Sequence, residues 1–505
     1  MPLPREIFST DQVRQFDRLA IETHGISGEV LMERAGQAAY QLLRQRWPTV
    51  RRIVVVCGSG NNAGDGYVVA RRARQEGCLA QVLSLGDLQR LQGDARRMAD
   101  RYRETGGDIL AFQGIVPEAD LIVDAVLGIG LEREVTGRWA EAFQAMNHHP
   151  SPLLAIDIPS GLQADTGRIL GEAVRATATI TFIGLKPGLL TGEGPDCCGE
   201  LFFDDLALPA VVYQNEPPVA RRLLWDHQGR TFGWRRRTAH KGHFGHVLVV
   251  GGAPGLGGAA RLAAEAAARV GAGLVSIATH PDHAPLLSLT RPELMSHGVP
   301  NGAALVPLLK RATAVAVGPG LGRGDWAREL WPIVRDSGLP LVVDADALNL
   351  MAEEDFHPVP PGWVLTPHPG EAARLLGQTA AAVQADRLSA LRQLQRHWGG
   401  VTVLKGAGTL VAAQGQMTIG LYPGANPGLA SGGMGDVLTG LVAGLMAQGW
   451  SAREAAETAV CLHGEAANRA SQPGGERGLL ALDLFPELRR LVNPQAASVK
   501  PDRRH

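Results

Sequence analysis

The chain lacks the features that tie a protein to a membrane or to nucleic acid. Its 49 basic and 50 acidic residues leave a formal net charge of −1, so the molecule as a whole does not attract an anionic surface. No uninterrupted apolar run approaches the roughly 18 residues needed to cross a bilayer, and the first residues lack the apolar core of a signal peptide. We therefore expect no membrane partner and no nucleic-acid partner.

Cysteine is scarce, and its spacing excludes two further classes of protein. The chain has five cysteines, with no C-x-x-C pair and no histidine at the spacing of a zinc site: Cys57, Cys78, Cys197, Cys198 and Cys461. Neither a structural zinc nor a disulfide framework is indicated. Together with the missing signal peptide, this predicts a cytoplasmic protein.

Glycine is abundant, with 63 residues, beside 45% hydrophobic and 20% charged residues. This composition is typical of a globular α/β protein with many tight turns between strands and helices. At 505 residues the chain is too long for one ordinary hydrophobic core. We therefore predict two domains, residues 1–215 and 240–496. Residues 216–239, which prolines and charges interrupt, are predicted to connect them.

Short apolar runs alternate with helix-length segments through the first domain. The runs are RIVVVC, AQVLSL, DLIVDAV, PLLAIDI and ATATITF. Because they are apolar on both faces, they predict parallel strands covered by helices on both sides, which is a doubly wound sheet in a three-layer α/β/α fold. Residues 28–47 carry apolar residues at helical spacing and predict a helix against this sheet.

A second alternation begins near residue 246. Its runs HVLVV, GLVSIAT, TAVAV, PLVVD, WVLTP and VTVL are mostly followed by or end in Gly, Pro, Asp or His. Ligands of open α/β sheets bind at the carboxyl ends of strands, so this domain is also predicted to carry a site. The stretch TLVAAQGQMTIGLY predicts a hairpin, and the second sheet should therefore contain antiparallel strands.

Polar side chains cluster where three strands of the first domain end. Carboxylate, amide and hydroxyl oxygens that meet at one sheet edge suit a cation, a ribose or a phosphate. Taken singly, each of these residues could equally shape a turn or cap a helix. As a group they favour a ligand site. They are Asn61, Asn62, Asp65, Asp124, Asp157 and Ser160.

The motifs that carry these residues, GSGNNAGDG, VDAVLGIGL and AIDIPSGL, resemble the NAD(P)H-hydrate epimerase domain. This Rossmann-like family interconverts the two C6 epimers of hydrated nicotinamide cofactors, and the resemblance covers residues 8–215. It implies that Asn62, Asp124 and Ser160 hold a potassium ion and that Asp157 is catalytic. The implied substrate-binding residues are Asn61, Asn62, Ala63, Gly64, Asp65, Gly128, Ile129, Gly130, Leu131, Glu132, Arg133, Glu134 and Asp157.

One residue of the first motif departs from the family pattern. Ala63 stands where the family more often has glycine, and alanine would be strained there if the loop required a positive φ. The chemistry itself needs a carboxylate, because epimerising a hemiaminal carbon requires water to leave and return through an iminium-like cation. Asp157 suits both the proton transfer and the stabilisation of that cation.

The strongest motif of the second domain is NPGLASGGMGDVLTGLVAGLMAQG, residues 426–449. Glycines at positions 432, 433 and 435 precede a predicted amphipathic helix, so backbone amides and the helix dipole form a site for an anion. Asp436 lies in the first turn of that helix. One interpretation is that an acidic residue at this position does no more than interact favourably with the helix dipole. The glycine-rich setting favours the other interpretation, a catalytic base.

Two further loops follow strands of the second domain. VLKGAGTLVAA contains Lys405–Thr409, which can hold a nucleotide phosphate or ribose, and LTPHPGEAARLLG places His368 at a strand end, as a polar cap or a substrate contact. With VGPGLG and DADALN, these stretches resemble the ADP-dependent NAD(P)H-hydrate dehydratase, a member of the ribokinase-like superfamily. The resemblance covers residues 240–491.

This second resemblance implies a ribokinase-like α/β domain that uses ADP and Mg²⁺. Asp436 would be the catalytic base that deprotonates the substrate hydroxyl, and phosphoryl transfer would turn that hydroxyl into a better leaving group. The implied contacts to the hydrate are Ala259, Gly320, His368 and Asp436. The implied nucleotide contacts are Lys405, Gly406, Ala407, Gly408, Thr409 and Gly435.

The two resemblances together predict a bifunctional metabolite-repair enzyme. It would epimerise hydrated NADH and NADPH (NADHX and NADPHX) and dehydrate the S epimers with ADP as co-substrate. We also expect a homo-oligomer. The alternative is a ribokinase-like small-molecule kinase fused to a non-catalytic binding domain. Such a kinase would use the same Asp436 but release a stable phosphorylated product, while the intact Asp157 and cation cluster argue against a non-catalytic first domain.

Overall fold

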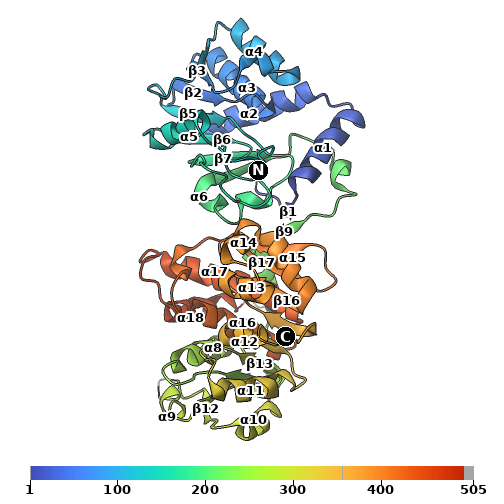
Figure 1. The fold of residues 1–505 in the computed structure, drawn as a ribbon, viewed down its shortest axis with the longest axis vertical. Helices are drawn as coiled ribbons and strands as arrows, with labels where there is room; N and C mark the ends of the chain where they lie inside the picture. The colour runs from blue at the N-terminus through green and yellow to red at the C-terminus, as the bar shows by residue number, and fades with distance from the viewer. Residues whose placement is uncertain (1, 290, 355, 494–505) are drawn as a thin grey trace, which may run out of the picture. The chain divides into compact units, whose positions relative to one another are not determined.

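The computed structural model describes residues 2–289, 291–354 and 356–493. The chain forms two compact units, residues 1–222 and residues 223–505 (Figure 1). The division falls within residues 216–239, the stretch that the sequence assigns to a connector. The predicted end of the second domain, residue 496, lies outside the described residues.

The first unit is built on a parallel sheet with the strand order β4-β3-β2-β5-β6-β7-β8. The five predicted strands are confirmed. The edge strands β4 and β8 are missing from the prediction. None of their residues is buried, and β4 has only three residues, too few to show a strand pattern. The strands are β2 (Arg52–Cys57), β3 (Leu79–Ser84), β4 (Ile109–Ala111), β5 (Leu121–Ala125), β6 (Leu153–Ile156), β7 (Ala178–Phe182) and β8 (Glu200–Asp204), and a separate antiparallel pair joins β1 (Glu6–Ile7) to β9 (Ala220–Arg222).

Helices cover both faces of this sheet, as the doubly wound pattern predicts. Along β2, Ile53, Val55 and Cys57 contribute to one core with α1 to α4, while Val54 and Val56 contribute to a second core with α5. This alternation produces the three-layer α/β/α arrangement. The helices are α1 (Thr10–Glu22), α2 (Gly28–Arg46), α3 (Asn61–Gln75), α4 (Gly93–Glu104), α5 (Arg138–His148) and α6 (Gly194–Cys198).

The second unit has a sheet with the strand order β18-β17-β16-β15-β14-β13-β10-β11-β12. Neighbours from β16 to β12 are parallel, and β17 pairs antiparallel with both β16 and β18, which confirms the predicted hairpin. The strands are β10 (His246–Val250), β11 (Leu274–Thr279), β12 (Met295–Gly298), β13 (Ala314–Val317), β14 (Leu341–Val343), β15 (Val359–Leu365), β16 (Gly399–Leu404), β17 (Thr409–Ala413) and β18 (Ile419–Tyr422).

Residues 223–239 contribute to the core of the second unit. Leu223 is buried in its apolar cluster, and Trp225 and Phe232 pack against that cluster. The helices of this unit are α7 (Trp225–Gln228), α8 (Gly257–Arg269), α9 (Ala284–Leu287), α10 (Gly302–Leu309), α11 (Asp325–Arg335), α12 (Ala345–Met351), α13 (Pro369–Leu376), α14 (Ala380–Ala385), α15 (Arg387–Trp398), α16 (Met434–Ala447), α17 (Ala452–Ser471) and α18 (Leu484–Leu491).

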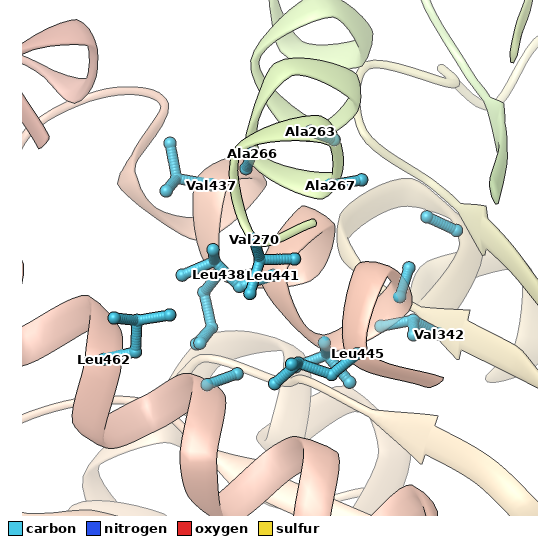
Figure 2. Packing of buried hydrophobic residues seen from close by; sticks show 14 of the residues in the cluster. Ala263, Ala266, Ala267, Val270, Val342, Val437, Leu438, Leu441, Leu445 and Leu462 are labelled. Atoms are coloured by element: carbon cyan, nitrogen blue, oxygen red, sulfur yellow. The ribbon is translucent and has the colours of Figure 1, made fainter. Parts of the chain in front are cut away.

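Helix α16, which follows the glycine motif, differs from its prediction. The sequence predicts an amphipathic helix, but every residue from Val437 to Ala447 is buried. The reason is that α16 is packed against α8 and α17 and also contacts the sheet, so that no face is left for solvent. Figure 2 shows Val437, Leu438 and Leu441 of α16 beside small residues of α8.

No helix of the described residues is long and apolar enough to cross a membrane. The cytoplasmic location and the homo-oligomer stay predictions. All five cysteines are free and buried. Burial raises the pKa of the Cys197 thiol to about 11, and it also raises the pKa of the Cys57, Cys198 and Cys461 thiols.

The contact between α8 and α16 depends on Gly440. A Cβ atom at this position would lie 2.0 Å from the Ala263 carbonyl oxygen and 2.8 Å from the Ala266 Cβ. We predict that Gly440→Leu lowers the free energy of unfolding by about 1–3 kcal/mol or more, because the added side chain must push the helices apart. Urea denaturation measures this. Gly474→Ala is the control, since nothing lies within 4 Å of its Cβ position; equal stability of the two variants would contradict the prediction.

Candidate active sites

Three neighbouring strands of the first unit, β2, β5 and β6, bring the predicted residues to one sheet edge. Asn62 lies in the first turn of α3 directly after β2, Asp124 lies within β5, and Asp157 and Ser160 follow β6. A cavity of about 620 Å³ opens there. The predicted residues that line it are Asn61, Asn62, Asp65, Gly128, Ile129, Gly130, Arg133 and Asp157.

The other predicted residues of this loop set have different surroundings. Ala63 and Leu131 are buried in the two apolar cores, and Glu132 and Glu134 are exposed. Gly64 lies in α3 against Met32, where a Cβ would be 2.2 Å from the sulfur atom. Ala63 has helical backbone inside α3, so the strain considered from the sequence does not arise.

Asp124 is fully buried and is held by Ser160. The Ser160 hydroxyl donates to Asp124 Oδ1 at 2.6 Å, and the Ser160 amide donates to Oδ2 at 2.8 Å. The Val126 amide also donates to Oδ1, at 3.2 Å. Burial raises the pKa of Asp124 to about 6 although these hydrogen bonds lower it. The carboxylate therefore lacks a compensating positive charge.

Asn62 provides the second sign of a cation site. Its amide nitrogen donates to the Leu127 carbonyl oxygen at 3.1 Å, which fixes the side chain. Its Oδ1 atom is buried and accepts no hydrogen bond from any described residue. An orphaned amide oxygen near a buried carboxylate and a hydroxyl is a set of hard oxygen ligands, and this chemistry fits an alkali or alkaline-earth cation.

Asp157 has an unusual backbone and a partner that the sequence analysis misses. Its φ is 67°, a left-handed conformation that costs a non-glycine residue about 1–3 kcal/mol. Its Oδ1 accepts from the buried Lys186 ammonium at 2.6 Å and from the Thr181 hydroxyl at 3.1 Å. Asp65 lines the same cavity, and burial together with Asp157 and Asp17 raises its pKa well above the ordinary value.

In the second unit, Lys405 at the end of β16 is the centre of a charged cluster. Its ammonium lies 2.8 Å from Asp344 Oδ1 and 3.8 Å from Glu371 Oε2. The other Asp344 oxygen accepts from the Thr439 hydroxyl of α16 at 2.7 Å. Asp344 thus connects the ends of β14 and β16 to α16.

Asp436 lies in the first turn of α16, as predicted. Gly433 caps this helix with a φ of 87°, a left-handed conformation that favours glycine. A Cβ atom on Gly435 would lie 3.4 Å from the Lys405 ammonium, so this loop and Lys405 are close. Burial raises the pKa of Asp436 to about 7. The negative charge of Asp344 adds to this rise, and the positive charge of Lys405 opposes it. A carboxyl with this pKa can take up a proton at neutral pH.

His368 and the pair of Ala259 with Gly320 complete the predicted substrate contacts. His368 caps α13: its Nδ1 accepts from the Gly370 amide at 2.9 Å, and half of its side chain is exposed. Burial and Lys405 lower its pKa, so the neutral ring carries its proton on Nε2. Gly320 has a φ of 58°, and a Cβ there would lie 3.2 Å from the Ala259 Cβ.

Arg387 at the start of α15 holds the loop of residues 405–409 through hydrogen bonds to its backbone carbonyl groups. Its side chain is 1% exposed, and Nη2 donates to the carbonyl oxygens of Lys405 at 3.2 Å and of Leu404 and Gly408 at 3.4 Å each. Burial lowers its pKa to about 10. A planar donor group with this geometry fixes the loop backbone.

The chain matches two known families, one in each unit. The family described as YjeF-related protein N-terminus matches residues 28–188, and the family described as NAD(P)H-hydrate dehydratase matches residues 247–490. The bifunctional NAD(P)H-hydrate repair enzyme Nnr of Coxiella burnetii is 47% identical over 489 residues, which cover 97% of this chain and 99% of that relative. The chain belongs to the bifunctional NAD(P)H-hydrate repair enzymes.

Other members of the repair-enzyme family match over the same length. The enzyme of the same name from Escherichia coli K12 is 42% identical over 504 residues, covering 99% of this chain and 96% of that one. A solved ribokinase-like superfamily protein from Enterococcus faecalis V583 has a TM-score of 0.50 and 27% identity, and it covers 54% of this chain and 94% of that chain. The predicted family and the predicted fold class are confirmed.

The buried charged residues of this repair enzyme that are absent from the predicted sites include Lys186, Asp344 and Arg387. Asp344 follows an apolar strand within DADALN, a position that could have singled it out. Lys186 interrupts the apolar run TFIGLKPGLL, and a lysine in such a run is buried only when it is paired. Arg387 has no comparable signal, because it bonds to a loop that follows a different strand.

We predict that Arg387→Met lowers the free energy of unfolding by about 1–3 kcal/mol, because three carbonyl groups lose a charged donor. Amide hydrogen exchange of residues 405–409 should become faster in the same variant, since the loop opens more often. Arg392→Met is the matched control, because Arg392 is exposed on the same helix. The prediction fails if both variants exchange these amides at the rate of the unmodified chain.

Proposed function

We propose that each unit performs one step of the repair of hydrated nicotinamide cofactors. The first unit epimerises NADHX and NADPHX at C6, and the second unit dehydrates the S epimers to NADH and NADPH with ADP. The observation that carries this proposal is that two separate sets of acidic groups lie at strand ends of two separate sheets. Relatives that match along the whole chain bear the name of a bifunctional repair enzyme.

In the first unit, we assign complementary roles to two carboxyl groups of the cavity. Asp65, whose pKa is raised, keeps a proton that it can give to the departing hydroxyl at C6. The carboxylate of Asp157 stabilises the iminium cation that remains. Water then adds to the opposite face of the ring, and the proton returns to Asp65. The epimers interconvert without net consumption of any reactant.

The cation of this site is proposed to be potassium. Asn62 Oδ1, the Asp124 carboxylate and Ser160 would hold it, which would satisfy the orphaned Asn62 oxygen and the buried charge of Asp124. When bound, the ion supplies a fixed positive charge that attracts phosphate or ribose oxygens of the substrate. The cavity residues 61–65 and 128–134 would bind the rest of the substrate.

In the second unit, Asp436 is proposed as the general base. It takes the proton of the C6 hydroxyl, the hydroxyl oxygen bonds to the terminal phosphorus of ADP, and the bond from that phosphorus to AMP breaks. The group at C6 then leaves as phosphate, which gives an iminium cation, and loss of the C5 proton to water forms the C5–C6 double bond of the dihydronicotinamide. Lys405–Thr409 and Gly435 would hold ADP, with the α16 amides around the transferring group. Ala259, Gly320 and His368 would contact the hydrate.

Mg²⁺ would enter this site with the nucleotide. Among the described residues, no group of three or more His, Cys, Asp or Glu side chains is arranged to hold a metal ion. This fits Mg²⁺, which is commonly held by phosphate oxygens with only one or two carboxylates. The alternative of a small-molecule kinase with a non-catalytic first domain has less support, because the named relatives match along both units. A stable phosphorylated product would identify such a kinase.

The two activities should be separable by single substitutions. We predict that Asp436→Asn abolishes the nucleotide-dependent return of dihydronicotinamide absorbance while epimerisation persists, and that Asp157→Asn does the reverse. The assay supplies mixed epimers of hydrated NADH with ADP or ATP, and with K⁺ or Na⁺. Chiral analysis of the remaining hydrate follows epimerisation. Loss of both activities in one well-folded variant would refute the assignment of two sites.

Dehydration should depend on pH near neutrality. Asp436 acts as a base only when it has lost its proton, and its pKa is raised to about 7. We therefore predict that kcat/KM for the hydrate falls about tenfold per pH unit below that value and levels off above it. Epimerisation by the same preparation is the internal control, because Asp436 has no role in it. A dehydration profile that is flat between about pH 5.5 and 8.5, roughly a unit and a half below and above this pKa, would contradict the role of Asp436.

A further inference from the structure

Lys186 is one of the largest fully buried side chains of the chain, with 1% of its surface exposed. It follows β7 and precedes a short 3-10 turn at residues 187–189. A lysine is almost never buried to this extent unless an anion compensates its charge. Its place in the fold therefore calls for a reason beyond packing.

The Lys186 ammonium has three acceptors, which match its three protons. They are Asp157 Oδ1 at 2.6 Å, the Thr181 hydroxyl at 3.0 Å and the Phe182 carbonyl oxygen at 2.9 Å. The Thr181 hydroxyl donates in turn to Asp157 Oδ1 at 3.1 Å. Lys186, Thr181 and Asp157 thus form a closed triangle in which every proton is used.

This triangle leaves one oxygen of Asp157 for the cavity. In the part of the chain that the structure describes, Asp157 Oδ1 accepts both hydrogen bonds and Oδ2 accepts none. A Cβ atom on Gly128 would lie 3.5 Å from Oδ2, so this oxygen faces the loop of residues 128–134 that lines the cavity. The two hydrogen bonds to Oδ1 therefore fix the direction of Oδ2, although the backbone of Asp157 is in a left-handed conformation.

We propose that Lys186 is the positioning residue of the epimerisation site, where its ion pair with Asp157 Oδ1 fixes that side chain and directs its Oδ2 atom at the reacting carbon. The inference rests on the proposed epimerisation. Lys186 itself does not reach the substrate, because its three protons are already bonded within the protein.

Lys186 is the cation of the cavity lining that bonds to Asp157. Asp65 of α3, Asp17 of α1 and Asp94 at α4 line the same cavity, and its other basic groups are Arg14 and Arg133. Among the described residues, the side-chain partners of Asp157 are Lys186 and Thr181. Removal of Lys186 would therefore leave Asp157 Oδ1 with the Thr181 hydroxyl alone.

The test measures epimerisation by Lys186→Met and Thr181→Val, each alone and each combined with Asp157→Glu, which keeps a carboxylate but displaces it. We expect Lys186→Met to lower kcat about 100-fold with little change in KM. Thr181→Val keeps the cation and removes one hydrogen bond, so it should lower kcat about tenfold in the same sense. Circular dichroism and dehydration activity report the folding of the variants.

The double variants separate positioning from a structural role. If Lys186 acts by directing Asp157, Lys186→Met costs less kcat in Asp157→Glu, whose carboxylate is already displaced, than in the unmodified chain. Additive losses of kcat, or an unchanged kcat in folded Lys186→Met, overturn the proposal. If Lys186→Met does not fold, an unchanged kcat in Thr181→Val overturns it instead. If Asp157→Asn alone leaves epimerisation intact, the proposed function of the first unit fails, which is a different result.

Discussion

An ammonium group that is buried or partly buried is costly unless an anion compensates its charge, and this constraint organises both sites. Lys186 pairs with Asp157 at 2.6 Å in the first unit, and Lys405 pairs with Asp344 at 2.8 Å in the second. Each aspartate directly follows an internal strand of its sheet, β6 or β14. The ion pair thereby fixes a carboxylate at the edge where parallel strands end. The neighbouring acids Asp65 and Asp436 then lie beside a charge that is already compensated, and burial leaves them ready to hold a proton.

Much of this arrangement could be predicted from sequence, because the signals are local. An apolar strand followed by Asn, Asp or Gly predicts both the sheet and the position of the polar residue, and Asn62 after β2 and Asp157 after β6 follow this rule. Asp124 is the penultimate residue of β5. The residues that compensate these charges could not be predicted in the same way. Lys186 is 29 residues from Asp157, Lys405 is 61 residues from Asp344, and Arg387 bonds to carbonyls 17 to 21 residues away. No spacing rule connects such pairs before the sheet is formed.

The prediction that α16 is an amphipathic helix is wrong for a related reason. An amphipathic pattern predicts a helix with one solvent face, but the small residues of α8 let α16 approach so closely that its whole circumference is covered. Gly440 lies over the backbone of Ala263, and Leu441 and Leu445 of the same helix belong to the buried cluster (Figure 2). Hydrophobic periodicity describes one helix at a time and contains no information on how many neighbours surround it. The first turn of α16 is consequently anchored by the rest of a buried helix, which keeps Asp436 beside Lys405.

The burial of all five cysteines has a consequence for the chemical durability of the protein. Peroxides react with the thiolate form of cysteine, and desolvation inside both cores keeps Cys57, Cys197, Cys198 and Cys461 in the thiol form. None of the candidate catalytic groups contains sulfur. Oxidants that inactivate thiol-dependent enzymes would therefore find no reactive cysteine on the described surface. Cofactor repair would then continue under conditions that inactivate such enzymes.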